Sequence, residues 1–226
     1  MTPSLRADFT QREVVLPGSA PWVPSPSTGV ERGMLDRIGG EDGRATSIVR
    51  YAPNATFPRH AHPGGEEFLV LDGLFIDEHG EYPAGTYVRN PVGSSHAPHA
   101  GPAGARLFVK LHQFAAGDGR RVVVDTSTAV WRPGTAVGLS VLPLHEHGDE
   151  HVALVRWAPG TTFHRHSHWG GEEIVVMEGV FRDEYGAYPA GSWLRSPHLS
   201  THTPFTKSEG ATLFVKVGHL GAHPKA

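Results

Sequence analysis

The chain carries one distinctive stretch twice: TFPRHAHPGGEE at residues 56–67 returns as TFHRHSHWGGEE at residues 162–173. The same offset of 106 positions relates the sequence that follows each stretch. Across residues 48–111 the match to the second copy needs no gap, and more than half of the aligned positions are identical. Chance does not produce identity over so long a segment, so the chain contains an internal duplication.

The duplicated unit has the length of a whole domain. Solenoid repeats span only about 20–50 residues, so this period does not belong to a repeat array. A small and polar stretch at residues 115–120 is suited to a linker. We therefore predict two tandem domains, residues 1–118 and residues 119–226.

The sequence pattern in each copy is typical of β-strands. Runs rich in branched and aromatic residues alternate with Gly and Pro, and in the first copy these runs are residues 48–51, 68–71, 74–77, 86–89 and 107–111. Asp72-Gly73 and residues 78–81 between them are predicted turns. No segment keeps a 3.6-residue period for more than two helical turns. We expect an all-β protein made of two sandwiches or barrels.

The composition excludes several classes of function. Lys and Arg number 20 against 23 Asp and Glu, a formal net charge of -3, so there is no basic excess to bind nucleic acid. No apolar run approaches the roughly 20 residues of a membrane-spanning helix, and the N-terminal sequence lacks the apolar core of a signal peptide. Cysteine is absent, which excludes disulfides and thiolate nucleophiles. We expect a cytoplasmic protein that binds neither nucleic acid nor membranes.

Histidine is abundant, with 16 residues in the chain, and the duplicated stretch places several of them in a regular pattern. His60 and His62 share one face if the chain there is extended, and Glu66 has the same parity. His96 follows about 30 residues later, on a different predicted strand. Imidazoles and a carboxylate that meet at one point suit a divalent first-row metal. The second copy repeats the set as His166, His168, Glu172 and His202.

These motifs resemble the cupin superfamily. The first cupin motif matches His60, His62, Glu66 and Gly73, and the second matches His96 ahead of a proline. The longer sequence pattern around these motifs, in both copies, is similar to that of the ChrR-like cupin family. The resemblance implies a bicupin: two double-stranded β-helix, or jelly-roll, barrels, each with one divalent metal ion such as Zn, Fe, Ni or Mn. It favours Glu66 and Glu172 as ligands, although Glu67 and Glu173 also fit the looser cupin spacing.

Two functions follow from the resemblance. One is a small-molecule metalloenzyme of the cupin dioxygenase type, with a six-coordinate metal that keeps two positions open; its catalytic residues are not assigned. The other is a zinc-binding sensor related to the anti-sigma factor ChrR. A sigma factor is not the expected partner, because only about 45 Pro-rich residues precede the first cupin core and no cysteine is present. We expect a small-molecule ligand, and exposed strand edges leave room for a homodimer.

Other residues near the motif have two interpretations each. The aromatic residues Phe57, Phe75, Tyr87 and Phe108, with their counterparts in the second copy, either wall a pocket or pack in the core. Arg59 and Arg165 have the parity opposite to the ligands and are expected to point outward. Arg89 and Arg195 either hold an anionic substrate or form a salt bridge. The copies also differ, since Pro58 and Pro63 correspond to His164 and Trp169. His164 is then either a partner of the second site or exposed to solvent.

Overall fold

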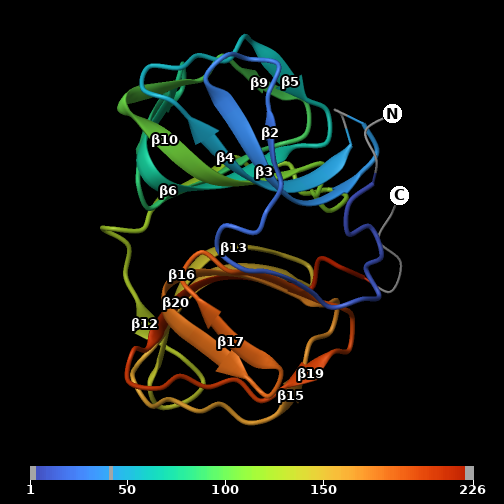
Figure 1. Cartoon of the computed structure of the whole chain (residues 1–226), viewed down its shortest axis with the longest axis vertical. Coiled ribbons are helices and arrows are strands. Elements are labelled where there is room, and N and C mark those ends of the chain that lie inside the picture. The colour runs from blue at the N-terminus through green and yellow to red at the C-terminus, as the bar shows by residue number, and fades with distance from the viewer. Residues whose placement is uncertain (1–3, 41–42, 222–226) are drawn as a thin grey trace. The chain divides into compact units, whose positions relative to one another are not determined.

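The computed structural model describes residues 4–40 and 43–221, and every regular element in this part of the chain is a β-strand. The strands form two barrel-like units, coloured mainly blue to green and yellow to red in Figure 1. The described residues contain no helix long and apolar enough to cross a membrane. The all-β prediction is therefore confirmed.

The first unit is built on one eight-stranded sheet and one short ladder. Its sheet has the order β11-β8-β6-β10-β4-β3-β2, with β7 paired to β6, and β5 pairs with β9 separately. The strands are β2 (Trp22–Pro24), β3 (Val30–Ile38), β4 (Arg44–Tyr51), β5 (His60–His62), β6 (Glu66–Asp77), β7 (Gly80–Pro83), β8 (Thr86–Asn90), β9 (Ser94–His96), β10 (His99–Leu111) and β11 (Val122–Asp125).

The second unit repeats this plan. Its sheet has the order β1-β18-β16-β20-β14-β13-β12, with β17 paired to β16, and β15 pairs with β19. The strands are β1 (Glu13–Val15), β12 (Arg132–Pro133), β13 (Leu139–His147), β14 (Glu150–Trp157), β15 (His166–Ser167), β16 (Glu172–Asp183), β17 (Gly186–Pro189), β18 (Trp193–Ser196), β19 (Thr201–His202) and β20 (Ala211–Val217).

Alternation along the strands creates the core of each barrel. On β10, Leu107 and Val109 enter the hydrophobic cluster of the first unit, whereas Phe108 and Lys110, which alternate with them, do not. Both are more than 90% buried, as are Phe68 and Phe75 from β6 in the same cluster. The second unit has an equivalent cluster around Phe181 and Leu213. Neither cluster includes any of the predicted metal ligands.

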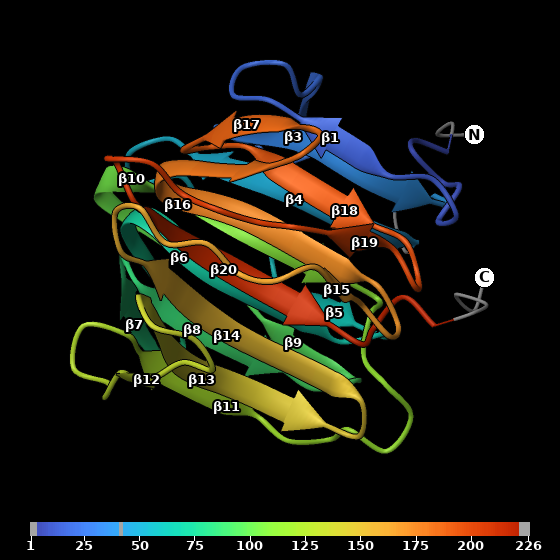
Figure 2. The ribbon, with the colours of Figure 1, turned by 90° about the horizontal axis from the view of Figure 1, so that it is seen from below.

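The compact units do not coincide with the predicted domains 1–118 and 119–226. One unit gathers residues 20–129 with the segment that ends at Ala7, and the other gathers residues 8–19 with the chain from Val130 onward. The cause is an exchange of edge strands: β1 pairs with β18 of the second barrel (Figure 2), and β11, which follows the linker, pairs with β8 of the first. The boundary at 118 separates the sequence repeats, not the folded units.

One predicted turn is also wrong. β6 runs without interruption through Asp72-Gly73, where the ladder to β10 shifts register. Gly73 has a φ of 76°, and a Cβ there would stand 2.1 Å from the carbonyl oxygen of Gly104. The Asp-Gly pair therefore marks a bulge that bends a long strand, as Gly in the left-handed region can do. The other predicted turn, at residues 78–81, is confirmed at Glu78 and His79, which connect β6 to β7, whereas residues 80 and 81 already belong to β7.

Candidate metal centre

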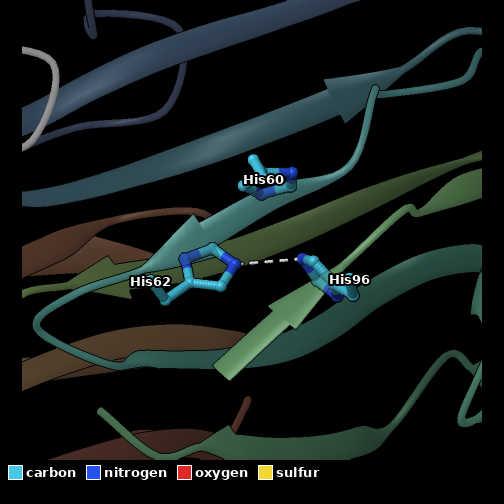
Figure 3. A group of neighbouring side chains, drawn as sticks. All are labelled: His60, His62 and His96. Atoms are coloured by element: carbon cyan, nitrogen blue, oxygen red, sulfur yellow. Dashed lines mark hydrogen bonds between the residues drawn. The ribbon is translucent and has the colours of Figure 1, made fainter. Parts of the chain in front are cut away.

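The short β5–β9 ladder brings the three predicted histidines of the first barrel together. His60 lies directly opposite His96 in the antiparallel register, and His62 follows two positions later on the same face. Figure 3 shows His60 and His62 on one strand and His96 on the next, with the three rings close to one another. One ring nitrogen from each lies within 4.8 Å of the other two.

Hydrogen bonds fix which nitrogen of each ring faces the centre. Nδ1 of His60 lies 2.9 Å from the carbonyl oxygen of Pro58, and Nδ1 of His96 lies 3.0 Å from Asp77 Oδ2. Both partners are acceptors, so each Nδ1 carries the proton in a neutral ring and each Nε2 keeps its lone pair. The Nε2 atoms of His62 and His96 stand 3.0 Å apart (Figure 3).

Glu66 is the fourth member of the group. A turn closed by the Gly65 amide and the His62 carbonyl carries the chain back, so that Glu66 begins β6 beside the histidines. Its Oε2 lies 3.5 Å from His62 Nε2 and 3.6 Å from His96 Nε2. The Asn90 side-chain amide donates to the same oxygen at 3.0 Å, which fixes the carboxylate in place.

The second barrel repeats this arrangement with small differences. His166 pairs with His202 across the β15–β19 ladder, and Nδ1 of His166 donates to the His164 carbonyl at 3.0 Å. Oε2 of Glu172 lies 3.4 Å from His168 Nε2 and 3.7 Å from His202 Nε2. His168 Nε2 is buried without a hydrogen-bond partner in the described chain. The eight predicted ligands therefore converge as two quartets.

The two carboxylates differ in their electrostatics. Burial raises the pKa of Glu172 to about 7. Burial acts on Glu66 in the same direction, but His62 and His96, together with the Asn90 hydrogen bond, lower the pKa of Glu66 below its ordinary value. Position 196, which matches Asn90, is a serine in the second copy. Burial also lowers the pKa of His168 to about 3, so this imidazole is neutral and its lone pair is available.

Both quartets fit a divalent metal ion. Two ligand atoms that each lie about 2.1 Å from one ion, at an angle between 90° and the tetrahedral angle, stand about 3.0–3.4 Å apart. In the first barrel, the separations among the ligand atoms of His62, His96 and Glu66, from 3.0 to 3.6 Å, are close to this range. Three imidazole lone pairs and one carboxylate are also ligands that Zn²⁺ and other first-row ions accept. The buried, unpartnered Nε2 of His168 further indicates that something is to be bound there.

Glu67 and Glu173, the alternative ligands, lie on the opposite side of their strands. Glu67 accepts from Arg89 at 2.7 Å and from the Tyr87 hydroxyl at 3.2 Å. Glu173 accepts from the Trp193 indole N–H at 2.7 Å. The strand alternation that places Glu66 beside the histidines thus removes Glu67 from them.

The structure also shows the contacts of the arginines near the motif. Arg89 is fully buried and forms a salt bridge with Glu67 and with Asp118, at 2.5 Å, so of its two predicted roles it has the salt bridge. Arg195 is also buried and donates to the Asp8 carbonyl at 3.1 Å. Arg59, as predicted, points outward, where it pairs with Glu78.

A cavity of about 240 Å³ opens onto the first quartet and reaches His60, His62 and Glu66. Phe57 and Phe75 line it, as one of their two interpretations predicted. Tyr87 binds Glu67 on the other face of the sheet, and Phe108 is not among the lining residues; for these two the pocket interpretation is wrong. Other apolar walls of the cavity are Val49, Leu107, Val109 and Leu111.

Several residues of the site escaped prediction. Asp77 and Asp183 hold the Nδ1 side of the late histidines, at 3.0 and 3.5 Å, and their repetition in both copies was an available signal. Asn90 and the cavity residue His112 occur in one copy only, so the duplication gave no signal for them. His164 is exposed, which decides between its two interpretations.

The family model of the ChrR cupin-like domain matches this chain twice, at residues 10–115 and 119–221. The chain belongs to the ChrR cupin-like family. A search of curated proteins found no match. The resemblance inferred from the sequence is thus confirmed, and this ChrR cupin-like protein is a bicupin with a candidate metal-binding group in each barrel.

Solved structures share the fold of this ChrR cupin-like protein. A Nostoc punctiforme protein titled a "putative dioxygenase" has a TM-score of 0.78 at 16% identity, covering 96% of this chain and 85% of its own. Escherichia coli YlbA has a TM-score of 0.70 at 14% identity, covering 92% and 91%. A mutant of Bacillus subtilis oxalate decarboxylase has a TM-score of 0.61 at 14% identity, covering 93% and 77%. At these identities the likeness concerns the fold alone.

Proposed function

We propose that this protein is a divalent-metal-dependent enzyme of the cupin dioxygenase type, which acts on a small organic molecule. The observation that carries the proposal is the cavity of about 240 Å³ that leads to His60, His62 and Glu66 in the first barrel. A purely structural metal site needs no such space. The fold neighbour titled a "putative dioxygenase" and the oxalate decarboxylase mutant agree with an enzymatic role.

The metal, when bound, would act as a Lewis acid with positions left open for substrate oxygen atoms. The protein prepares this chemistry through its own residues. Pro58 and Asp77 orient the rings of His60 and His96 so that each Nε2 lone pair faces the centre. Glu66, held at Oε2 by Asn90, is the carboxylate placed to accept a proton from a molecule in the cavity.

A zinc-binding sensor is the second candidate. Three imidazoles and Glu66 would complete the four-coordinate set of a closed zinc site, and Glu66 lies within 3.6 Å of two of them. Such a site would bind an effector or a partner without turnover.

Metal content and oxygen consumption separate the two candidates. The full chain, purified without added metal, is analysed for Zn, Fe, Ni and Mn and then assayed for oxygen uptake on a panel of 1,3-diketones and hydroxy ketones. Iron, nickel or manganese with substrate-dependent oxygen uptake supports the enzyme. Zinc at two ions per chain with no uptake on reconstitution with iron supports the sensor, and absence of all metals contradicts both.

The histidine variants assign the sites. His96→Ala and His202→Ala are each expected to remove about one metal ion per chain, because each deletes one of three converging imidazoles. Exposed His99→Ala is the matched control and is expected to retain both ions. Unchanged metal content in both ligand variants would show that the quartets do not bind the metal.

A further inference from the structure

The two barrels carry equivalent quartets, but the polar groups around them are not equivalent. The strand pairing shows which residues of the two copies are equivalent. Arg32 lies opposite Val49 on β4, and Val141 lies opposite Val155, the counterpart of Val49, on β14, so Arg32 and Val141 are equivalent. Residues 112 and 218 are equivalent as well, because the amide of residue 112 donates to the Gly65 carbonyl and the amide of residue 218 donates to the Gly171 carbonyl. At three positions that line the first cavity, the second copy has no polar side chain: Ser25, Arg32 and His112 correspond to Gly134, Val141 and Gly218. At a fourth, Tyr51 corresponds to Trp157, so an indole N–H replaces the hydroxyl.

His112 occupies a backbone conformation that favours glycine. Its φ is 58°, and the equivalent Gly218 has a φ of 79°. A side chain in this left-handed region strains the backbone, and such strain gathers at functional sites. The imidazole ring packs against Gly64, where a Cβ would stand 1.5 Å from its Cδ2 atom. In the first barrel, the His112 ring is therefore held at the cavity wall by a strained backbone at residue 112, and it needs a glycine at residue 64.

Two of the polar groups have no internal partner. Neither the His112 ring nor the Tyr51 hydroxyl makes a hydrogen bond within residues 4–40 and 43–221, and both side chains line the cavity. Burial and the Glu66 charge raise the pKa of Tyr51, so its hydroxyl stays protonated and can donate. Arg32 adds a positive charge to the same wall. The quartet residues His60, His62 and Glu66 and the Ser25 hydroxyl also line the cavity, and its other side chains are apolar. Donors and a cation beside an apolar surface are complementary to an anion with a hydrophobic body.

We propose that the first barrel alone binds the substrate, and that the substrate is a small carboxylic acid with an apolar body, positioned by His112, Tyr51 and Arg32. The inference rests on the proposed function, since it concerns the same site. Of the four equivalent positions, the second barrel keeps only an indole N–H, at Trp157, and has neither an imidazole nor a cation there, so it binds metal without this ligand. His112 is a positioning residue for the carboxylate and not a metal ligand.

The test uses two full-length variants that each load one barrel. His168→Ala with His202→Ala leaves only the first quartet, and His62→Ala with His96→Ala leaves only the second. Each is loaded with Co²⁺ without oxygen, and a cobalt content of one per chain with a normal circular dichroism spectrum shows that it is folded. Phenylpyruvate, an apolar 2-oxo acid, is then titrated while the visible Co²⁺ bands are recorded. Phenylacetone, which lacks the carboxylate, is the neutral control ligand.

We expect phenylpyruvate to shift the bands of the first variant at concentrations at least tenfold below those needed for the second. Equal binding by both barrels, or equal binding of phenylacetone, overturns the inference. Bound cobalt with no response to phenylpyruvate in either barrel also overturns it, but leaves the proposed metal site standing. Failure to bind cobalt in either barrel contradicts the proposed function itself.

His112→Gly separates a positioning role from a structural one. The variant adopts the residue of the second copy, and glycine relieves the positive φ, so we expect unchanged cobalt content and equal or higher thermal stability. Affinity for phenylpyruvate is expected to fall at least tenfold in the variant that loads the first barrel. Exposed His99→Ala is the control and is expected to retain full affinity. Unchanged affinity in His112→Gly would overturn the role of His112.

Discussion

The ring of His112 packs against Gly64, and a methyl group on residue 64 would overlap it at 1.5 Å from Cδ2. Gly64 is not among the glycines with positive φ, so its backbone alone does not require glycine. We therefore predict that Gly64→Ala destabilises the protein by about 1–3 kcal/mol through overpacking. Urea unfolding measures the change. In the His112→Gly background the same substitution is expected to cost less; an equal cost in both backgrounds would show that the ring is not what excludes the methyl group.

The carboxylates behind the late histidines are expected to control metal affinity. Asp77 accepts a hydrogen bond from the Nδ1–H of His96, and Asn in its place preserves the shape but removes the charge. We predict that Asp77→Asn weakens metal binding in the first barrel by about 10–100-fold and leaves the second barrel unaffected. Asp183→Asn should have the reciprocal effect. Competition with a chelating dye measures both affinities, and loss at both sites from one substitution would contradict the assignment.

An arginine from the N-terminal segment is expected to stabilise the second barrel. Arg12 donates to Asp183 Oδ2 at 2.9 Å and to the Tyr188 hydroxyl at 2.7 Å, and the Asp183 side chain is fully buried. Removal of Arg12 leaves a buried carboxylate short of a charged donor, which costs about 1–3 kcal/mol. We predict faster hydrogen exchange in β16 and weaker metal binding by the second quartet in Arg12→Ala.

Exposed Arg59 provides the control for this variant. Its salt bridge with Glu78 lies on the surface, so Arg59→Ala should change stability by no more than about 1 kcal/mol. If Arg12→Ala altered exchange in the first barrel instead, the strand exchange described above would be incorrect.

Removal of metal is expected to lower the melting temperature without unfolding the chain. Each barrel has a closed hydrophobic cluster that includes none of the quartet residues. Ligand binding to the folded state adds stability by mass action, about 4 kcal/mol at a free metal concentration 1,000 times the Kd. Calorimetry should therefore show cooperative unfolding both with and without EDTA, at a lower temperature in the sample with EDTA. A chain without cooperative unfolding after metal removal would mean that the metal is needed to fold.

Much of this architecture could be predicted from residue patterns. The offset between the copies identified the duplication. The two-residue period of strands placed His60 and His62 on one face of β5, and Glu66 and Glu67 on opposite faces of β6. The strand exchange could not be predicted, since residues 11–15 and 120–124 are similar and either could close either sheet edge. His112 was missed because its role depends on a ring packed against a distant backbone, which spacing in the sequence does not encode.

The exchange of the edge strands β1 and β11 has a consequence for the history of the duplicated gene. Neither half of the coding sequence specifies a finished barrel, because each half supplies the closing strand of the other. Two modules joined in this way cannot be shuffled or discarded one at a time, since the survivor would be left with a bare edge ready to aggregate. Mutual dependence of this kind keeps a second barrel in the protein even when only one of the pair performs chemistry.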